Sequence, residues 1–411
     1  MAGRGNREAF LWMAGLSVVT LALGAAREMW IARELRASGA ADLFFRGLVV
    51  IGATRSIGLS VFRSRWIPAP REVGARHLVA GERRVSALLA LTSVGVLLAI
   101  VGPGAWGDPS VWVAAASVIV ALFGAALRAL AERAGQLRRG FALDWALPIG
   151  AIAGAVLLPG GSLGPSLGIL AGVMVAAIGQ WPIAWGEGAL AAPTALEAGA
   201  SSASSAVDPA RSRALVVDAL TYVNLGVVEA ALSHVFAVGG FALINYASLF
   251  VNAALAVPSA ASTVLALRAA AGDPAAAHAR LRRWAVVGGL ASAASVAAIG
   301  LALAWAPIAA IVDGAIGWNV SEEAGVLVLL SVPFAGLRLA NTIGRQAQVA
   351  ADPSRLLGWS LGGLAGRAVI LGAGSQVIGV LASPLALGFA ELVQVGGWWR
   401  RPATRPGGSG P

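Results

Sequence analysis

Long apolar runs alternate with short polar segments along most of the chain. Each of these runs is about 18–25 residues long, the length that an α-helix needs to cross the hydrocarbon core of a bilayer. The pattern predicts twelve spans, at about 9–27, 40–62, 85–103, 111–131, 141–158 and 164–185, and at about 213–236, 240–267, 284–306, 324–345, 355–373 and 375–397. The period-two alternation typical of a β-barrel strand is absent from the sequence, so we expect an all-α polytopic membrane protein.

A segment of different composition divides the spans into two sets of six. Residues 186–212 are rich in Ala, Ser, Gly and Pro, which favours a flexible linker. We therefore predict an N-terminal six-helix lobe over 1–185, a flexible cytoplasmic linker over 186–212, a C-terminal six-helix lobe over 213–397 and a cytoplasmic tail over 398–411. The two sets are similar in hydropathy at matching positions. Paired repeats in transporters place the site between them, so we expect pseudo-symmetric lobes around a central cavity.

The composition supports a membrane protein and argues against an enzyme. Of the 411 residues, 58% are hydrophobic and only 12% are charged, whereas soluble domains carry about a quarter charged residues. There is no cysteine, so disulfides, thiolate metal sites and cysteine nucleophiles are excluded. The three histidines are scattered, and no zinc-protease, P-loop or serine-hydrolase motif occurs. We expect neither catalysis nor a metal or organic cofactor.

The arginines are distributed as in a protein that fixes its orientation in a bilayer. The net charge is +10, and every basic residue is arginine, which would also suit a nucleic-acid partner. Most arginines, however, lie in alternate short loops, with six in residues 63–84, four in 128–139 and four in 268–283. By the positive-inside rule these loops and both termini are cytoplasmic, and we expect no nucleic-acid partner. Residues 1–26 resemble a signal peptide in outline, but we expect them to stay as the first span.

A charged stretch between the first two spans is the exception to this pattern. Residues 25–48 contain Arg27, Glu28, Arg33, Glu34, Arg36, Asp42 and Arg46. Asp42 and Arg46 are one helical turn apart and are expected to pair at the outer rim. Arg55 lies about 20 Å along the helix axis from Asp42, near the middle of the membrane. A charge at that depth faces a wet cavity or a buried partner, and by default it marks a substrate path.

The same stretch resembles the opening of the lipid II flippases of the MurJ (MviN) type, in the multidrug/oligosaccharidyl-lipid/polysaccharide (MOP) exporter superfamily. Residues 27–47, REMWIARELRASGAADLFFRG, match the family's first loop without a gap. Residues 228–267, which begin VEAALSHVFAVGGFALINYA, resemble its seventh and eighth helices. Together the two matches cover about a fifth of the chain, and the predicted span count and layout agree over the rest.

The resemblance implies a flippase of a bacterial cytoplasmic membrane whose N-terminal lobe holds the substrate's diphosphate. Carried over, Arg27 and Arg55 would bind the phosphates, with Arg46 and Asp42 at the rim, and arginine suits this task because its planar fork binds phosphate oxygens bidentately. Two family arginines are replaced here, by Ala230 and Leu249. The chain also has twelve predicted spans where many such flippases have fourteen.

Span seven carries a second group of charges. Asp218 and Glu229 are eleven residues apart, almost three turns, so both lie on one helix face. Glu229 lies deeper than Asp218, and an intramembrane carboxylate suggests Na⁺ or H⁺ coupling. The resemblance adds that relatives have a sodium site involving helix seven. Glu229 pairing with an arginine such as Arg367 is the alternative, and Asp144 is expected to pair with the arginines that precede it.

The expected function is translocation of a lipid-linked saccharide, such as the peptidoglycan precursor lipid II, by alternating access. The expected partners are the lipid-linked saccharide diphosphate, the bilayer and cell-envelope biosynthesis proteins. One alternative is an exporter of another lipid-linked glycan, or of drugs or metabolites, in the same superfamily. The other is a non-transporting scaffold of a cell-envelope assembly complex, which the replacements at Ala230 and Leu249 leave open.

Overall fold

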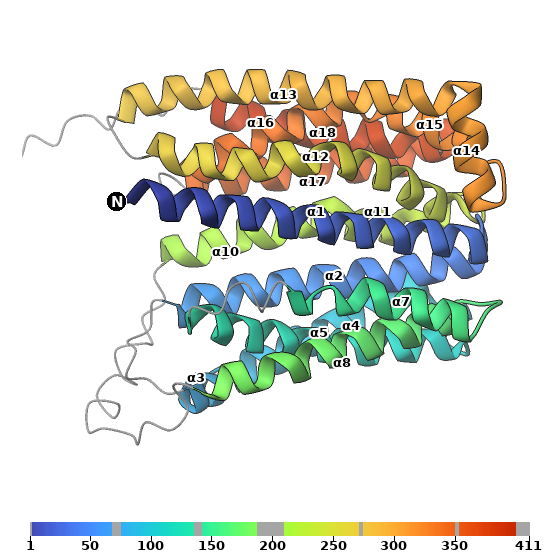
Figure 1. Ribbon diagram of the computed structural model, residues 1–411, viewed down its shortest axis with the longest axis horizontal. Coiled ribbons are helices and arrows are strands. Elements are labelled where there is room, and N and C mark those ends of the chain that lie inside the picture. The colour runs from blue at the N-terminus through green and yellow to red at the C-terminus, as the bar shows by residue number, and fades with distance from the viewer. Residues whose placement is uncertain are drawn as a thin grey trace, which may run out of the picture.

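The computed structural model describes residues 2–67, 75–134, 142–186, 209–270, 274–349 and 353–399. All regular elements in these ranges are helices, and most of the long ones run along one axis, whereas α14 lies across it at one end (Figure 1). The principal helices are α1 (Ala2–Leu35), α2 (Gly39–Trp66), α3 (Ala75–Gly81), α4 (Arg83–Val101), α5 (Pro109–Arg133), α7 (Ala146–Leu157), α8 (Leu163–Gly186), α10 (Pro209–Tyr222), α11 (Val228–Leu232), α12 (Gly240–Ala270), α13 (Pro274–Ala304), α14 (Ala306–Ile316), α15 (Ser321–Leu330), α16 (Val332–Val349), α17 (Pro353–Ile378) and α18 (Ala382–Trp399). The π-helical turn Val223–Val227 joins α10 to α11.

The chain is an all-helical, multi-pass membrane protein. In the part that the structure describes, seven helices are long and apolar enough to cross a membrane, or eight if the bent pair α15 and α16 forms one span. One of the seven, Leu356–Trp399, runs through both α17 and α18, which pack against each other. Helices lie in all the ranges expected as spans, but α7 (Ala146–Leu157), with 12 residues, is short for a crossing. The count of twelve therefore stays a prediction.

Local sequence signals explain where several helices begin and end. Ser38 caps α2 by accepting a hydrogen bond from the Ala41 amide, and Asp108 caps α5 by accepting one from the Ser110 amide. Pro109 follows at the first helical position of α5, where its missing N–H costs nothing. Gly317 ends α14 with a φ of 85°, a left-handed conformation that favours glycine.

The helices pack in two groups that follow the chain order. In the first group α2, α4, α5 and α8 pack together, and α7 packs on α8; in the second, α12, α13, α16 and α18 pack together. Helix α1 lies between the groups and contacts both α7 and α12 (Figure 1). This order agrees with two halves, but the boundaries at 185 and 213 stay predictions. Most of the linker and the tail beyond Trp399 lie outside the described residues, and α10 already begins at Pro209.

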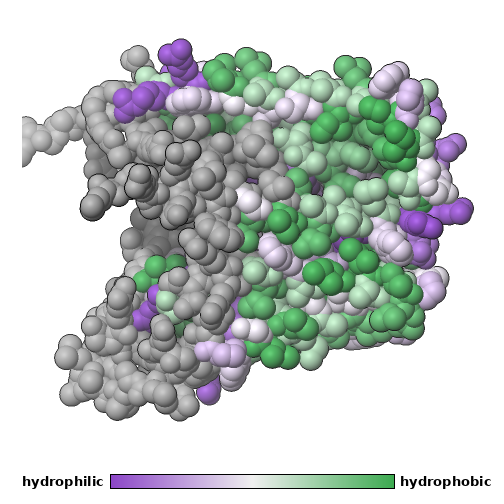
Figure 2. All heavy atoms as spheres, viewed as in Figure 1, coloured by the Kyte–Doolittle hydropathy of each residue, from purple (hydrophilic) through white to green (hydrophobic). Residues whose placement is uncertain are grey.

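Apolar side chains form much of the outer surface. Figure 2 shows hydrophobic residues over most of the described part of one face, with hydrophilic residues mainly at the right-hand end and at the upper left. Exposed large hydrophobic residues lie on many helices, for example Leu91 on α4, Ile178 on α8 and Leu290 on α13. An outer face of this kind fits hydrocarbon better than water, because a soluble protein rarely leaves so large an apolar area uncovered.

Candidate functional site

Arg55 belongs to a run of ion pairs that joins three segments of the N-terminal half. Its guanidinium pairs with Asp144, which precedes α7, and Asp144 also pairs with Arg128 of α5. Arg128 Nε lies 3.1 Å from Glu132 Oε1, and Glu132 in turn pairs with Arg63 near the end of α2. We call these five residues the arginine–carboxylate chain. The predicted pairing of Asp144 with an arginine that precedes it is confirmed, and Arg55 has the buried partner that its depth requires.

The arginine–carboxylate chain carries a surplus of positive charge. Among its five described members, three guanidinium groups outnumber two carboxylates by one positive charge. The Arg128 side chain is 7% exposed, whereas Arg55 keeps 21% of its side-chain surface exposed and Arg63 38%. A guanidinium whose side chain is only partly buried can bind an anion through charge-assisted hydrogen bonds, so Arg55 and Arg63 are suited to this role.

Arg27 lies apart from this chain. Its guanidinium pairs with the adjacent Glu28 on α1, and its buried Nε has no hydrogen-bond partner among the described residues. Arg27 is eight residues from the end of α1 and Arg55 is sixteen from the start of α2, so they differ by about 12 Å in depth. The two arginines share no ion-pair partner, and their joint binding of one diphosphate stays a prediction.

Asp42 and Arg46 do not form the ion pair that their spacing predicts. The Asp42 carboxylate instead accepts hydrogen bonds from the amides of Gly239, at 2.7 Å, and Ala242, at 2.8 Å. It thereby caps the N-terminus of α12, whose first amides have no partner within the helix. Arg46 Nε donates to the Ser233 hydroxyl at 2.8 Å. Both side chains therefore bind the other half of the chain. The free amides at the start of α12 attract Asp42, and the buried Ser233 hydroxyl accepts a hydrogen bond from Arg46, so the two charges bind these groups and not each other.

Three further hydrogen bonds join the halves at this end. The Tyr246 hydroxyl donates to the Arg36 carbonyl at 2.9 Å, and the Trp318 indole donates to the Ala32 carbonyl at 2.8 Å. His234 Nε2 lies 2.7 Å from the carbonyl oxygen of Ile100. We call this region, where α1 ends and α2 and α12 begin, the closed end of the bundle.

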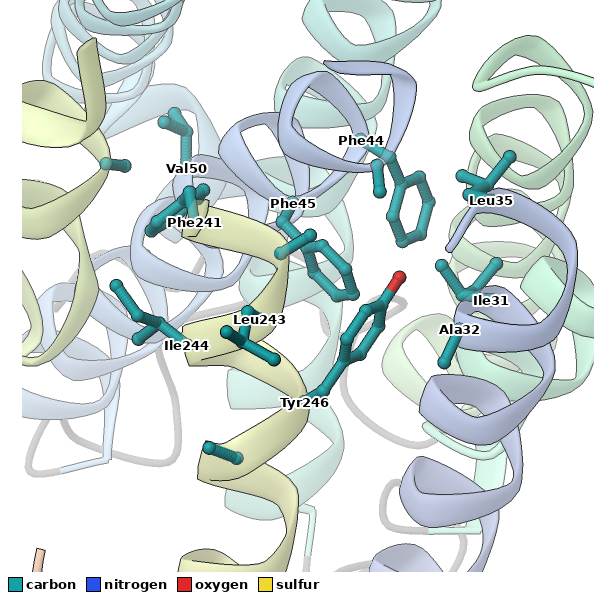
Figure 3. Close-up of a cluster of buried hydrophobic side chains, with 14 of the residues drawn as sticks. Ile31, Ala32, Leu35, Phe44, Phe45, Val50, Phe241, Leu243, Ile244 and Tyr246 are labelled. Atoms are coloured by element: carbon teal, nitrogen blue, oxygen red, sulfur yellow. The ribbon is translucent and has the colours of Figure 1, made fainter. Parts of the chain in front are cut away.

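An apolar cluster lies beside these hydrogen bonds. Figure 3 shows Phe44 and Phe45 of α2 facing Ile31 and Leu35 of α1 and the residues Phe241 to Tyr246 of α12. The Phe45 and Tyr246 rings meet edge to face with centroids 5.3 Å apart. Gly239 has a φ of 84°, and a Cβ there would lie 2.2 Å from the Ala37 carbonyl oxygen, so only glycine permits this approach. Apolar side chains and one close backbone approach therefore join the two halves at this end.

Glu229 is paired in the C-terminal half. Its Oε2 lies 3.1 Å from Arg367 Nη2 of α17, and its Oε1 accepts a hydrogen bond from Ser383 of α18. The structure thus forms the pair that was the alternative to ion coupling. Asp218 lies on α10, but its side chain is outside the part of the structure that is described.

A neighbouring buried carboxylate was not predicted. Glu391 of α18 accepts hydrogen bonds from Arg338 at 2.9 Å and from Asn341 at 2.6 Å, and Asn341 also donates to Gln394. Glu391 is fully buried. A sequence signal for it existed, because Glu391 is the only acidic residue of the last predicted span.

One further pocket lies in the described part of the chain, away from these clusters. Within the described residues, no group of three or more His, Cys, Asp or Glu side chains is arranged to hold a metal ion. A pocket of about 900 Å³ between α13, α14 and α15 is lined mainly by apolar and small residues, with Asp313 and Glu322. Asp313 already accepts hydrogen bonds from the amides of Val320 and Ser321. The predicted central cavity stays a prediction.

The fold is similar to the folds of several membrane transporters of known structure. The structure is similar to a lipid II flippase MurJ in an inward closed conformation, with a TM-score of 0.70 and 11% identity over 94% of this chain and 86% of that one. It is also similar to an inward-facing multidrug resistance MATE family transporter of the MOP superfamily (TM-score 0.63, 13% identity, 94% and 96% covered). A MATE transporter in complex with MaL6 matches with a TM-score of 0.53 and 11% identity over 95% and 94% of the chains. The sequence itself matches no protein-family model and no curated protein. At these identities the likeness shows the fold alone.

Proposed function

We propose that the protein moves a lipid-linked saccharide diphosphate, of the lipid II kind, across the bacterial cytoplasmic membrane. The observation that carries this proposal is the positive surplus of the arginine–carboxylate chain in an otherwise apolar bundle. A diphosphate would bind the guanidinium of Arg55, whose side chain is partly exposed, and Arg27 would contact the same head group from α1. The likeness to a MurJ flippase supports the choice of this substrate class over others.

Alternating access supplies the mechanism. The contacts of the closed end would separate while the opposite ends of the helices approach. The bound head group would then be open to the other side of the membrane. Each neutral hydrogen bond contributes about 1 kcal/mol. The hydrogen bonds of the closed end together can therefore stabilise the state in which this end is closed and still break when the protein changes state. The arginine-rich loops favour cytoplasmic termini, and we propose that the substrate moves from the cytoplasmic to the outer leaflet.

The test is rescue of a bacterial strain depleted of its own lipid II flippase. We expect wild type and Arg33→Ala to restore growth, and Arg55→Ala and Arg27→Ala to fail at equal membrane expression. Arg33 is the matched control because it is an exposed arginine at the end of α1 that lies over Trp30. In detergent, Arg55→Ala is expected to weaken binding of a short-chain polyprenyl diphosphate about 10- to 100-fold, the loss of one charge-assisted contact.

Other outcomes select between the alternatives. Failure of a well-expressed wild type to rescue, with diphosphate binding retained, would favour another lipid-linked glycan. Rescue by every arginine variant would favour a scaffold that acts without transport. Efflux of organic cations that does not depend on Arg55 would favour a drug exporter, the activity named for the MATE relatives.

A further inference from the structure

Three buried side chains meet where α11, α17 and α18 come together. Arg367 is 0% exposed, Glu229 5% and Ser383 1%, and both carboxylate oxygens of Glu229 already accept hydrogen bonds from the other two residues. We call this group the Glu229 junction. It lies in the C-terminal half, and none of its ion pairs involves the arginine–carboxylate chain.

The residues of the Glu229 junction do not fit a sodium ion. A hard cation needs several oxygen acceptors around it, and here the carboxylate's nearest charged neighbour is a guanidinium 3.1 Å away. The polar atoms of the junction left without a hydrogen-bond partner are Arg367 Nε and Nη1, both buried. These atoms are donors, so they would repel a cation and cannot coordinate one.

The charges around the junction are also balanced without an added ion. Glu229 faces Arg367, and the neighbouring Glu391 is bound by Arg338 and Asn341. Two carboxylates and two guanidinium groups sum to zero. Burying a carboxylate is costly unless a positive charge accompanies it, and Arg367 supplies that charge from within the chain.

We infer that Arg367 is the resident cation of the Glu229 junction and takes the place of a coupling metal ion there. The protein therefore functions without Na⁺ at Glu229, and any ion coupling takes place elsewhere. For its consequence in transport this inference rests on the proposed function. Its test does not, because it measures ion binding by the purified protein and involves no substrate.

The experiment compares thermal unfolding in NaCl and in choline chloride at equal ionic strength. Wild type is expected to unfold at the same temperature in both salts. Arg367→Met keeps much of the side-chain volume but leaves Glu229 unpaired, so its midpoint falls in choline and is expected to recover by about 2 °C or more in Na⁺. The matched control is the double variant Arg367→Met with Glu229→Gln, which has no carboxylate to neutralise and should not respond to Na⁺.

Two results would overturn the inference. One is a Na⁺-specific stabilisation of wild type that Glu229→Gln abolishes, because Na⁺ would then bind at Glu229 beside Arg367. The other is an Arg367→Met variant that folds but whose unfolding midpoint is the same in Na⁺ and in choline. The guanidinium of Arg367 would then not occupy a position at which a cation can bind. If Arg367→Met cannot be purified, wild type and Glu229→Gln are compared instead. The inference is supported if each of these two proteins unfolds at the same temperature in NaCl as in choline chloride.

Discussion

Asp42 is the residue whose environment departs furthest from its local sequence. It belongs to α2, yet both of its carboxylate oxygens bind amides about 200 residues away at the start of α12. A carboxylate at this place satisfies two otherwise free donors and also interacts favourably with the positive end of the α12 dipole. The side chain is 6% exposed, so water cannot easily replace it.

Removing this cap is expected to cost stability. We expect Asp42→Ala to lower the free energy of unfolding by about 1–2 kcal/mol, the typical cost of deleting a helix cap. Asp42→Asn should cost less, since its amide oxygen still accepts one of the two hydrogen bonds. Thermal or denaturant unfolding in detergent measures both changes. An unchanged stability in Asp42→Ala would mean that water or another side chain satisfies the α12 amides.

Sequence reasoning located the charged residues of the candidate site but not all of their partners. The depth of Arg55 predicted either a water-filled cavity or a buried partner, and the structure gives it the partner Asp144. The expected pairing of Asp144 with an arginine that precedes it is confirmed. The i, i+4 spacing of Asp42 and Arg46 gave the wrong pair, because spacing along one helix takes no account of a second helix that ends against it. Glu391 and Arg128 were missed as binding partners because their contacts depend on how distant helices pack.

At the scale of elements, small residues determine how closely the helices approach. Helices α7 and α8 pack backbone to backbone: a Cβ on Gly168 would lie 2.0 Å from the Gly150 carbonyl oxygen, and one on Gly172 would lie 2.3 Å from that of Ala146. Gly289 and Gly336 make a similar contact between α13 and α16. Helices in lipid associate mainly by such packing, because burying apolar surface gains little there.

The loss of stability on substituting these glycines should therefore depend on the atoms next to the added side chain and not on helix propensity. We expect Gly168→Leu to separate α7 from α8 and lower the free energy of unfolding by more than about 3 kcal/mol, or to prevent folding. Gly95→Ala in α4 is the matched control, since nothing lies within 4 Å of its added Cβ. This control should be neutral or stabilising by up to about 1 kcal/mol. Equal tolerance of both changes, measured by yield and unfolding, would contradict the backbone contact.

The apolar pattern predicted the positions of the helices better than the interruptions within them. The predicted span at 111–131 corresponds to Pro109–Arg133 and that at 164–185 to Leu163–Gly186. The pattern did not predict the π-helical turn Val223–Val227 or the break between α15 and α16. Hydropathy averaged over a window reports burial in lipid, whereas such interruptions depend on backbone hydrogen bonds that hydropathy does not encode.

At the scale of the whole molecule, hydrogen bonds of side chains and an apolar cluster join the two halves at the closed end. Besides Asp42, the closed end uses the hydrogen bonds of Arg46, His234, Tyr246 and Trp318, together with the apolar cluster of Figure 3. All of these are side-chain contacts, so they can separate without unfolding a helix. An arrangement of this kind suits an equilibrium between a closed and an open state at that end.

The chain has no cysteine, so one introduced thiol can report this equilibrium. Ala32 is 1% exposed and lies in the apolar cluster of the closed end, and we expect Ala32→Cys in detergent to react slowly with a hydrophilic maleimide. Adding Asp42→Ala removes about 1–1.5 kcal/mol that holds the halves together, so labelling should accelerate about tenfold. Asp108→Ala is the control, because it removes a cap within the N-terminal half alone. A similar acceleration in that control would indicate general destabilisation. No acceleration with Asp42→Ala would mean that the other contacts suffice to keep this end closed.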